Sequence, residues 1–265
     1  MESIDEIYAE VGRGVTEPYR ALVNEKNCII KNINNIEGHL SIFNDYVGNF
    51  LTNSVGFATP NFGFCIYTDK TKNNVGKSFE VGELFFYSEF VNNPLYINDI
   101  EILNEIEKED LVKLIIFDYF ILNEDRNTEN IFVNAETNSD RLTLYPIDYT
   151  HSFPGGVVWD MGQLGMKVKN NDFESFDIYI KKNHIHQLII EGIKISSDLV
   201  DKSAKHIYNN LEQVDFEEML RNIDQRLINK IFDNDLNDFK NFLNLRKSDF
   251  QILIDEIKIY FKEGD

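Results

Sequence analysis

The polar run over residues 123–130 contains side chains that could do chemistry. Asp125 and Asn130 lie five positions apart, between a strongly apolar segment over residues 111–122 and a short apolar run over residues 131–133. A buried helix followed by a strand would hold such a loop rigidly. Kinases use this spacing, with the aspartate as the base that accepts the proton of the attacking hydroxyl and the asparagine as a Mg²⁺ ligand. An ordinary polar turn is the alternative for the loop alone.

A second aspartate strengthens this interpretation. Residues 142–147 are predicted to form a strand, and Asp148 follows directly. A kinase carries an aspartate at this place to bind the Mg²⁺ that bridges the phosphates. Oxygen ligands from Asn130 and Asp148 suit Mg²⁺, which completes its coordination with phosphate oxygens and water. The sequence therefore predicts a Mg²⁺ site at these two residues, with a strand-end cap as the alternative for Asp148.

The N-terminal part offers residues that could bind the phosphates of ATP. Lys31 ends an apolar run that begins at Cys28, and a lysine there could neutralise phosphates as the lysine of the third kinase strand does. Gly12 and Gly14 lie in a predicted turn, where the lack of a Cβ lets main-chain N–H groups approach an anion. Each signal alone is weak, because edge strands often carry lysine and a simple hairpin also explains the glycines.

An acidic residue on the first predicted helix, over residues 38–53, could pair with Lys31. Asp45 lies beside the apolar stripe of that helix, and Glu37, just before the helix, is a rival. A surface carboxylate is the alternative for both residues, and the sequence leaves the choice between them open.

The aromatic run over residues 86–90 leads out of a predicted strand toward a change of composition near Pro94. In a kinase, the main chain at this place would hydrogen-bond the adenine. We therefore assign Phe86 and Glu89 to the predicted ATP site.

Two unlike parts of the chain must position these residues. Residues 1–91 are predicted to form short strands in an antiparallel meander with one helix, and residues 92–265 mainly helices. The expected fold is α+β, a two-lobed protein-kinase-like fold. Its antiparallel β-rich N-lobe, residues 1–91, would bind the nucleotide phosphates, and its helical C-lobe, residues 92–265, would carry the catalytic loop and metal site. The crevice between the lobes is the expected place for ATP and Mg²⁺.

Composition restricts the partners and the compartment. The 265 residues carry a formal net charge of −19, which repels polyanions, so we expect neither nucleic acid nor a membrane as a partner. Cys28 and Cys65 lie in apolar runs and are predicted to be buried free thiols. The N-terminus is acidic, and no apolar run is long enough to span a membrane. A cytoplasmic protein is expected.

Three segments resemble the HipA-like kinases. Residues 117–130 are similar to the catalytic segment of that family, which reads roughly D-x-x-x-x-N-x-D-R/x-x-x-x-N. The matching positions are Asp118, Asn123, Asp125 and Asn130. Residues 146–153 are similar to the metal-binding segment of its shorter, single-domain members, and residues 43–47 to the start of its N-E-Y helix. The resemblance covers about residues 10–155.

This resemblance implies a two-lobed kinase that phosphorylates serine or threonine with ATP. Some members are toxins that phosphorylate an aminoacyl-tRNA synthetase and are held by an antitoxin, so the resemblance also implies a protein substrate and an antitoxin or operon partner. The chain is too short for the extra N-terminal subdomain of the larger toxins, which argues against a toxin role and against their substrate.

The chain also departs from the family pattern within the matched segments. Asp45 replaces the usual glutamate and is one methylene shorter, so we expect a looser pair with Lys31. Tyr149 and Thr150 replace the small or histidine residues that usually follow the metal aspartate.

Two other functions fit part of the pattern. A small-molecule kinase of the same fold would use the same acidic residues, and an acidic cleft would favour a cationic acceptor. A pseudokinase that acts as a binding module would not need a base such as Asp125. The whole set of residues favours an enzyme that phosphorylates a protein hydroxyl.

Overall fold

Alternating apolar residues place the first part of the chain in short strands. The structure, a computed structural model, describes residues 1–12, 14–91, 94–97, 100–135 and 142–263. In β2, every second side chain is fully buried, as expected for a strand with one face on a core. The strands of the larger sheet are β1 (Glu2–Glu10), β2 (Tyr19–Val23), β3 (Lys26–Asn32), β4 (Phe62–Ile66), β5 (Lys72–Asn73) and β6 (Leu84–Glu89).

This sheet closes on itself like a small barrel. Its strand order is β2-β3-β6-β4-β1-β5, and β1 also pairs with β2. The antiparallel meander β1-β2-β3 is confirmed. The parallel pairs of β1 with β4 and β5 were not predicted from the sequence, because they join segments that are distant in the chain. Cys28 and Cys65 are buried free thiols inside the closed sheet, and burial raises the pKa of Cys28 to about 12.

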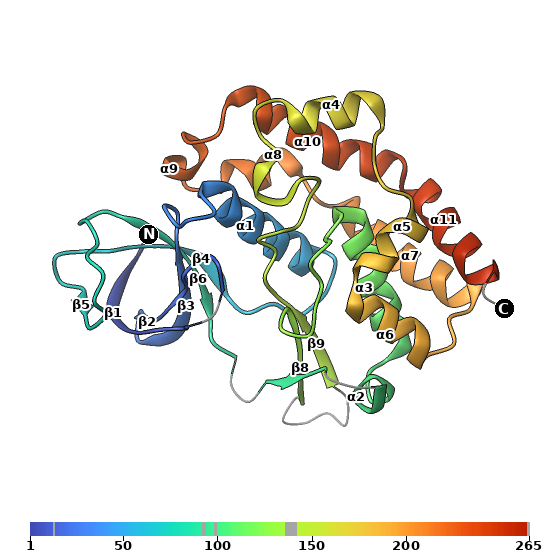
Figure 1. Cartoon of the computed structure of the whole chain (residues 1–265), viewed down its shortest axis with the longest axis horizontal. Helices are drawn as coiled ribbons and strands as arrows, with labels where there is room; N and C mark the ends of the chain where they lie inside the picture. The colour runs from blue at the N-terminus through green and yellow to red at the C-terminus, as the bar shows by residue number, and fades with distance from the viewer. Residues whose placement is uncertain (13, 92–93, 98–99, 136–141, 264–265) are drawn as a thin grey trace.

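One helix, α1 (His39–Ser54), lies between the sheet and the C-terminal helices (Figure 1). Its bounds match the predicted helix to within one residue at each end. The apolar stripe predicts one buried face, whereas the structure also buries Asn44, Asp45 and Asn49. Buried polar side chains need partners. Asp45 and Asn44 find partners in other segments, at Lys31 and at the main-chain oxygen of Thr150, whereas Asn49 donates to the main-chain oxygen of Asp45 within the helix.

Helices make up most of the second part of the chain. α3 (Lys108–Ile121) is apolar on nearly every side and packs against α7, α10 and α11, as expected for a buried helix. The other helices are α2 (Ile100–Asn104), the 3₁₀ turn η1 (Gly156–Val158), α4 (Gln163–Asn170), α5 (Phe176–Lys182), α6 (His184–Gly192), α7 (Ser197–Leu211), α8 (Phe216–Arg221), α9 (Gln225–Ile228), α10 (Asp233–Ser248) and α11 (Phe250–Glu263).

A second, three-stranded sheet follows α3 in the chain. It contains β7 (Leu95–Tyr96), β8 (Ile131–Ala135) and β9 (Leu142–Pro146), in the order β7-β8-β9. β8 and β9 pair so that Ile131 faces Pro146. The end of the catalytic loop and the start of the predicted metal segment are therefore neighbours.

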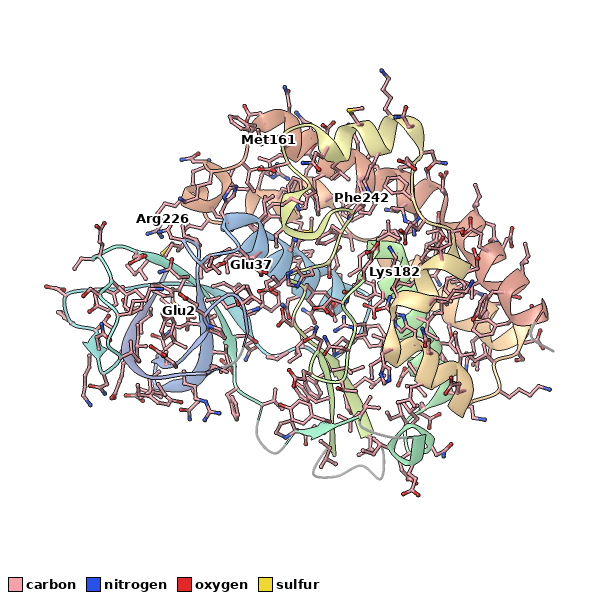
Figure 2. The ribbon with its side chains drawn as sticks, in the orientation of Figure 1. Glu2, Glu37, Met161, Lys182, Arg226 and Phe242 are labelled. Atoms are coloured by element: carbon pink, nitrogen blue, oxygen red, sulfur yellow. The ribbon has the colours of Figure 1, made fainter. Side chains whose placement is uncertain are left out.

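One hydrophobic core joins the two parts of the chain. It runs from Phe86 on the sheet through Phe43 on α1 and Phe117 on α3 to Phe242 on α10. Phe242 is buried among these side chains, whereas Met161 projects from the edge of the molecule (Figure 2). The predicted boundary after residue 91 lies beside residues 92–93, which are outside the described residues. Within the described ranges, no helix has the length and apolar character to cross a membrane.

Candidate active site

The predicted catalytic loop, residues 123–130, is held by its own amide side chains. α3 ends at Ile121, and its capping residue Leu122 has a left-handed conformation with φ 53° that turns the chain into the loop. The main-chain N–H of Asp125 donates to Asn123 Oδ1 at 3.1 Å. Asn130 Nδ2 donates to the main-chain oxygen of Asp125 at 2.7 Å and to its Oδ2 at 3.1 Å, and Asn127 Nδ2 donates to Oδ1 at 3.2 Å. The Asp125 side chain remains 46% exposed, which leaves its carboxylate open to an acceptor.

A buried arginine anchors this loop to the rest of the C-terminal part. Arg126 makes a two-point contact with Asp118 on α3, at 2.9 and 3.0 Å, and also donates to the main-chain oxygens of Asn130 and Ile147. Asp118 lies 3.0 Å from His186 Nε2 on α6. Burial raises the pKa of Asp118, but the Arg126 charge and the hydrogen bonds from His186 and Arg126 together outweigh burial and lower the pKa to about 2. The buried Arg126–Asp118 pair and the hydrogen bonds around it thus join the loop to α3, to α6 and to the segment after β9.

Lys31 brings together three segments that are far apart in sequence. Its Nζ lies 2.7 Å from Asp45 Oδ2 on α1 and 3.1 Å from Asp148 Oδ1 after β9. The same ammonium donates to Thr150 Oγ1 at 3.1 Å. Burial lowers the pKa of Lys31, but the charges of Asp148 and Asp45 outweigh this effect and raise it. Lys31 is therefore a cation between two carboxylates at the join of the two parts.

The geometry of the site shows which of the two acidic residues pairs with Lys31. Asp45 makes the pair, and Glu37 lies instead 2.9 Å from His151 Nε2. The expectation of a looser pair is wrong, because Asp45 is 1% exposed and fixed from a second side. The main-chain N–H of Tyr149 donates to Asp45 Oδ1 at 2.8 Å. The segment after β9 therefore approaches α1 closely enough to contact the aspartate, although this side chain is one methylene shorter than glutamate.

Tyr149 and Thr150, which depart from the family pattern, both have structural partners. Tyr149 lies directly against Gly48 of α1, where an added Cβ would be 2.1 Å from Tyr149 Cγ. The Arg126 guanidinium lies 5.0 Å from the centre of the Tyr149 ring. Thr150 Oγ1 donates to Asp45 Oδ2 at 3.2 Å. These two residues fasten the metal segment to α1.

The predicted glycine turn lies at the Lys31 end of the sheet. Glu10, Tyr19 and Ile30 are in register across β1, β2 and β3, and the turn between β1 and β2 extends beyond that row. Gly12 and Gly14 have positive φ angles of 71° and 98°, which glycine adopts readily. The turn thus has the backbone freedom that the sequence prediction requires, and it lies at the same end of the strands as Lys31.

The prediction for the adenine-binding segment needs correction at Phe86 and Glu89. Both residues lie in β6, which is paired on both sides with β3 and β4, so their main chain belongs to the sheet. The N–H of Glu89 donates to the main-chain oxygen of Asn61 at 2.7 Å, and its carboxylate pairs with Lys26. The side chain of Phe86 is buried beside Phe64. The main-chain groups of Phe86 and Glu89 are therefore engaged within the sheet.

The oxygen donors predicted to hold a metal come from neighbouring segments. Because Asn130 turns its Nδ2 toward Asp125, its Oδ1 is directed elsewhere. Asp148 has a positive φ of 55° and a side chain that is 41% exposed. An amide oxygen and a carboxylate are the donor chemistry that Mg²⁺ accepts in a phosphate site. The residues present fit the expected metal.

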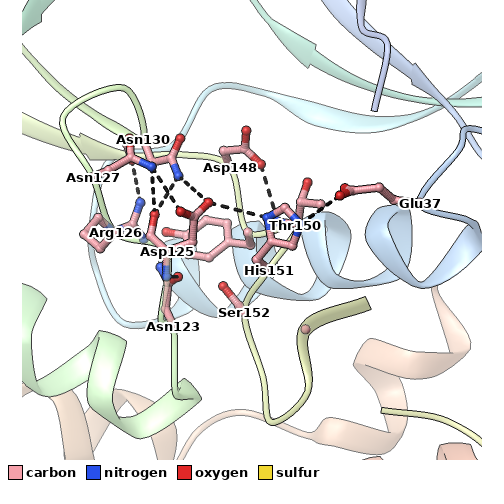
Figure 3. A network of polar contacts seen from close by, with 12 residues as sticks. Glu37, Asn123, Asp125, Arg126, Asn127, Asn130, Asp148, Thr150, His151 and Ser152 are labelled. Atoms are coloured by element: carbon pink, nitrogen blue, oxygen red, sulfur yellow. Dashed lines mark hydrogen bonds and ion pairs between the residues drawn. The ribbon is translucent and has the colours of Figure 1, made fainter. Parts of the chain in front are cut away.

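Some residues of the site were missed by sequence reasoning. His151 lies between Asp125 and Glu37, with Nδ1 3.5 Å from Asp125 Oδ2 (Figure 3). Its place in the metal segment, three residues after Asp148, was the available signal. Arg126 had a similar signal as the neighbour of Asp125, whereas nothing in the sequence connected His186 with the loop.

Comparisons with known proteins identify the family and the fold. A model of the HipA-like kinase family matches residues 4–233. The search of curated proteins gave no match. Among solved structures, the chain is similar to the Helicobacter pylori proinflammatory kinase CtkA, with a TM-score of 0.57 and 14% identity over 98% of this chain and 97% of that chain. This likeness confirms the kinase-like α+β fold. Because the family model spans most of the sequence, the chain belongs to the family of HipA-like kinases.

Proposed function

We propose that this protein transfers the γ-phosphoryl group of Mg²⁺-ATP to a serine or threonine hydroxyl of a protein. The observation that supports this most is the single site at which Lys31, Asp45 and Asp148 meet beside the loop that carries Asp125 and Asn130. Family membership supports a kinase that uses ATP. The proposal of Mg²⁺ rests on the chemistry of Asn130 and Asp148, whereas the class of acceptor rests on the family resemblance and the charge of the chain.

Asp125 has the position of the residue that orients the acceptor. Its carboxylate is held by two amides and remains half-exposed, so an incoming hydroxyl can donate a hydrogen bond to it. As the new bond forms between the hydroxyl oxygen and the γ-phosphorus, the bond from that phosphorus to the β-phosphate oxygen breaks. Asp125 accepts the hydroxyl proton, and ADP leaves.

Lys31, Asn130 and Asp148 have the chemistry to bind the triphosphate. Lys31 is cationic and held by Asp45, so it can pair with phosphate oxygens without a change of protonation. Asn130 and Asp148 would hold Mg²⁺, which neutralises charge on the phosphates when bound. Gly12 and Gly14 would allow main-chain N–H groups to approach the same phosphates.

A protein acceptor is proposed on the family resemblance and the charge of the chain. The net charge of −19 disfavours nucleic acids and anionic lipids as acceptors, because each phosphate would have to approach against repulsion. HipA-like kinases modify protein hydroxyls, as the resemblance implies. A small cationic molecule remains the competing acceptor.

The test is phosphoryl transfer by purified protein with Mg²⁺ and γ-labelled ATP. The acceptors are a cell lysate, the protein itself and an aminoglycoside. We expect labelled phosphoserine or phosphothreonine with the wild type, and a loss of about 10²–10⁴-fold in Asp125→Asn, because its amide cannot accept the proton. Glu124→Gln, which changes the neighbouring carboxylate of similar exposure, is the matched control and should retain activity. Transfer only to the aminoglycoside would refute the protein acceptor, and full activity in Asp125→Asn would remove Asp125 from the mechanism.

A further inference from the structure

His151 forms a bridge between two carboxylates in the site. Its Nε2 lies 2.9 Å from Glu37 Oε1 and its Nδ1 lies 3.5 Å from Asp125 Oδ2 (Figure 3). Both ring nitrogens therefore face acceptors. A neutral imidazole can donate from only one nitrogen, whereas an imidazolium donates from both. The geometry consequently favours a cationic His151 held between two anions.

The contact with His151 differs from the other contacts of the Asp125 carboxylate. Asn127 and Asn130, which also donate to it, belong to the same loop as Asp125 and fix its local conformation. Among the described residues that contact this carboxylate, His151 comes from a different segment, after β9. Only a contact from another segment can relate the orientation of Asp125 to the rest of the site.

Glu37 depends on His151 for its orientation. The Glu37 side chain is 14% exposed, and its second oxygen, Oε2, is buried with no hydrogen-bond partner among the described residues. A buried carboxylate that lacks a partner is unfavourable. The imidazolium of His151 thus offsets a charge that would otherwise be poorly compensated, and this keeps the bridge in place.

The bridge begins next to α1, the helix that also holds Lys31. Glu37 lies two residues before His39, the first residue of α1, and Asp45 lies within the same helix. α1 is therefore connected to the phosphate-binding side of the site through Asp45 and to the acceptor side through Glu37 and His151. A shift of α1 would therefore move the residues on the phosphate-binding side and those on the acceptor side together.

We propose that His151 is a positioning residue that, together with Glu37, aligns the Asp125 carboxylate with the acceptor hydroxyl and couples that alignment to α1. The inference rests on the proposed function, since it assigns Asp125 to the acceptor. It predicts an effect on the transfer step and none on the binding of ATP, because neither Glu37 nor His151 belongs to the proposed phosphate or metal contacts.

The test is a double-mutant cycle on the purified enzyme with His151→Gln, Glu37→Gln and the double variant. kcat and the KM for ATP are measured by phosphoryl transfer. We expect kcat to fall about 10- to 100-fold in His151→Gln, as for a misaligned reacting group, with the KM for ATP unchanged. The double variant should be no slower than His151→Gln alone, because the two side chains act as one unit. His184→Gln, an exposed histidine on α6, is the matched control.

Each other outcome contradicts a defined part of the inference. An unchanged kcat in His151→Gln would overturn the positioning role, and a KM for ATP that rises while kcat holds would assign His151 to the nucleotide instead. Multiplicative losses in the cycle would show that Glu37 and His151 act separately. If the wild type transfers no phosphate to any acceptor, the proposed function fails and the positioning role fails with it.

Discussion

His151 is the residue whose surroundings change its chemistry most clearly. Its hydrogen bond with Asp125, and then that with Glu37, raise its pKa to about 9, against the opposing effect of burial. The pKa of an ordinary histidine is about 6.5. Because the folded-state pKa is raised, the stabilisation from the imidazolium is complete below about 6.5 and is lost as the pH rises through about 9.

This titration can be followed by NMR of the imidazole protons. The chain has five histidines, so the His151 signal can be assigned from its absence in His151→Gln. We expect a midpoint near about 9 in the wild type, and a lower midpoint in Glu37→Gln, which removes one of the two anions. A wild-type midpoint near about 6.5 would contradict the bridge, whatever the enzyme activity.

At the residue scale, spacing in the sequence proposes the reacting groups but not their partners. Asp125, Asn130 and Asp148 were proposed from spacing, because kinase chemistry requires these side-chain types after particular elements. The partner of Lys31 was left open between Asp45 and Glu37, because one lies within the first helix and the other just before it, and only the packing of α1 distinguishes them. Such contacts depend on how distant segments meet, which spacing does not encode.

At the scale of elements, α1 is fitted closely to the metal segment. Gly48 in the middle of this helix faces Tyr149, and an added Cβ would lie 2.1 Å from Tyr149 Cγ. Glycine to alanine in a helix interior normally stabilises by up to about 1 kcal/mol. Here the clash reverses the sign, and we expect Gly48→Ala to destabilise the protein by about 1–3 kcal/mol. Chemical denaturation measures this, with Gly76→Ala, which meets open space, as the control; a stabilised Gly48→Ala would disprove the close fit.

The buried contact of Arg126 holds the catalytic loop on α3. Replacing it by methionine leaves the Asp118 carboxylate buried without its main partner, and loss of one partner of a buried ion pair typically costs about 3–5 kcal/mol. We expect Arg126→Met to lower the denaturation midpoint strongly, whereas Arg221→Met, at an arginine side chain that is 71% exposed, should have little effect. Equal stability of the two variants would show that the loop does not depend on this anchor.

The elements themselves were largely predictable, but their pairing was not. The strand Tyr19–Val23 and the helix α1 have local periodicities that determine their type and approximate bounds. The parallel contacts of β1 with β4 and β5 join residues that are distant in sequence, and no local pattern specifies them. The closure of the sheet is therefore a property of the folded chain.

At the scale of the whole molecule, the two predicted lobes share one core. Phe86 of the sheet, Phe43 of α1 and Phe117 of α3 belong to the same buried cluster. The site lies where the sheet, α1 and the segment after β9 meet, since Lys31, Asp45 and Asp148 come from these three places. A ligand bound there would contact both parts and stabilise the molecule as a unit.

Mg²⁺-ATP should therefore raise the thermal unfolding temperature of the whole protein in a single transition. At a ligand concentration of about 100 Kd, binding to the folded state alone adds about 2.7 kcal/mol, which corresponds to roughly 5–10 °C for a chain of this size. Asp148→Ala removes a proposed metal ligand and should lose most of this shift, as should the wild type with excess EDTA. Asp125→Asn, which changes the acceptor side, should keep it. Differential scanning fluorimetry distinguishes these cases, and an equal shift in Asp148→Ala and wild type would rule out Asp148 as a metal ligand.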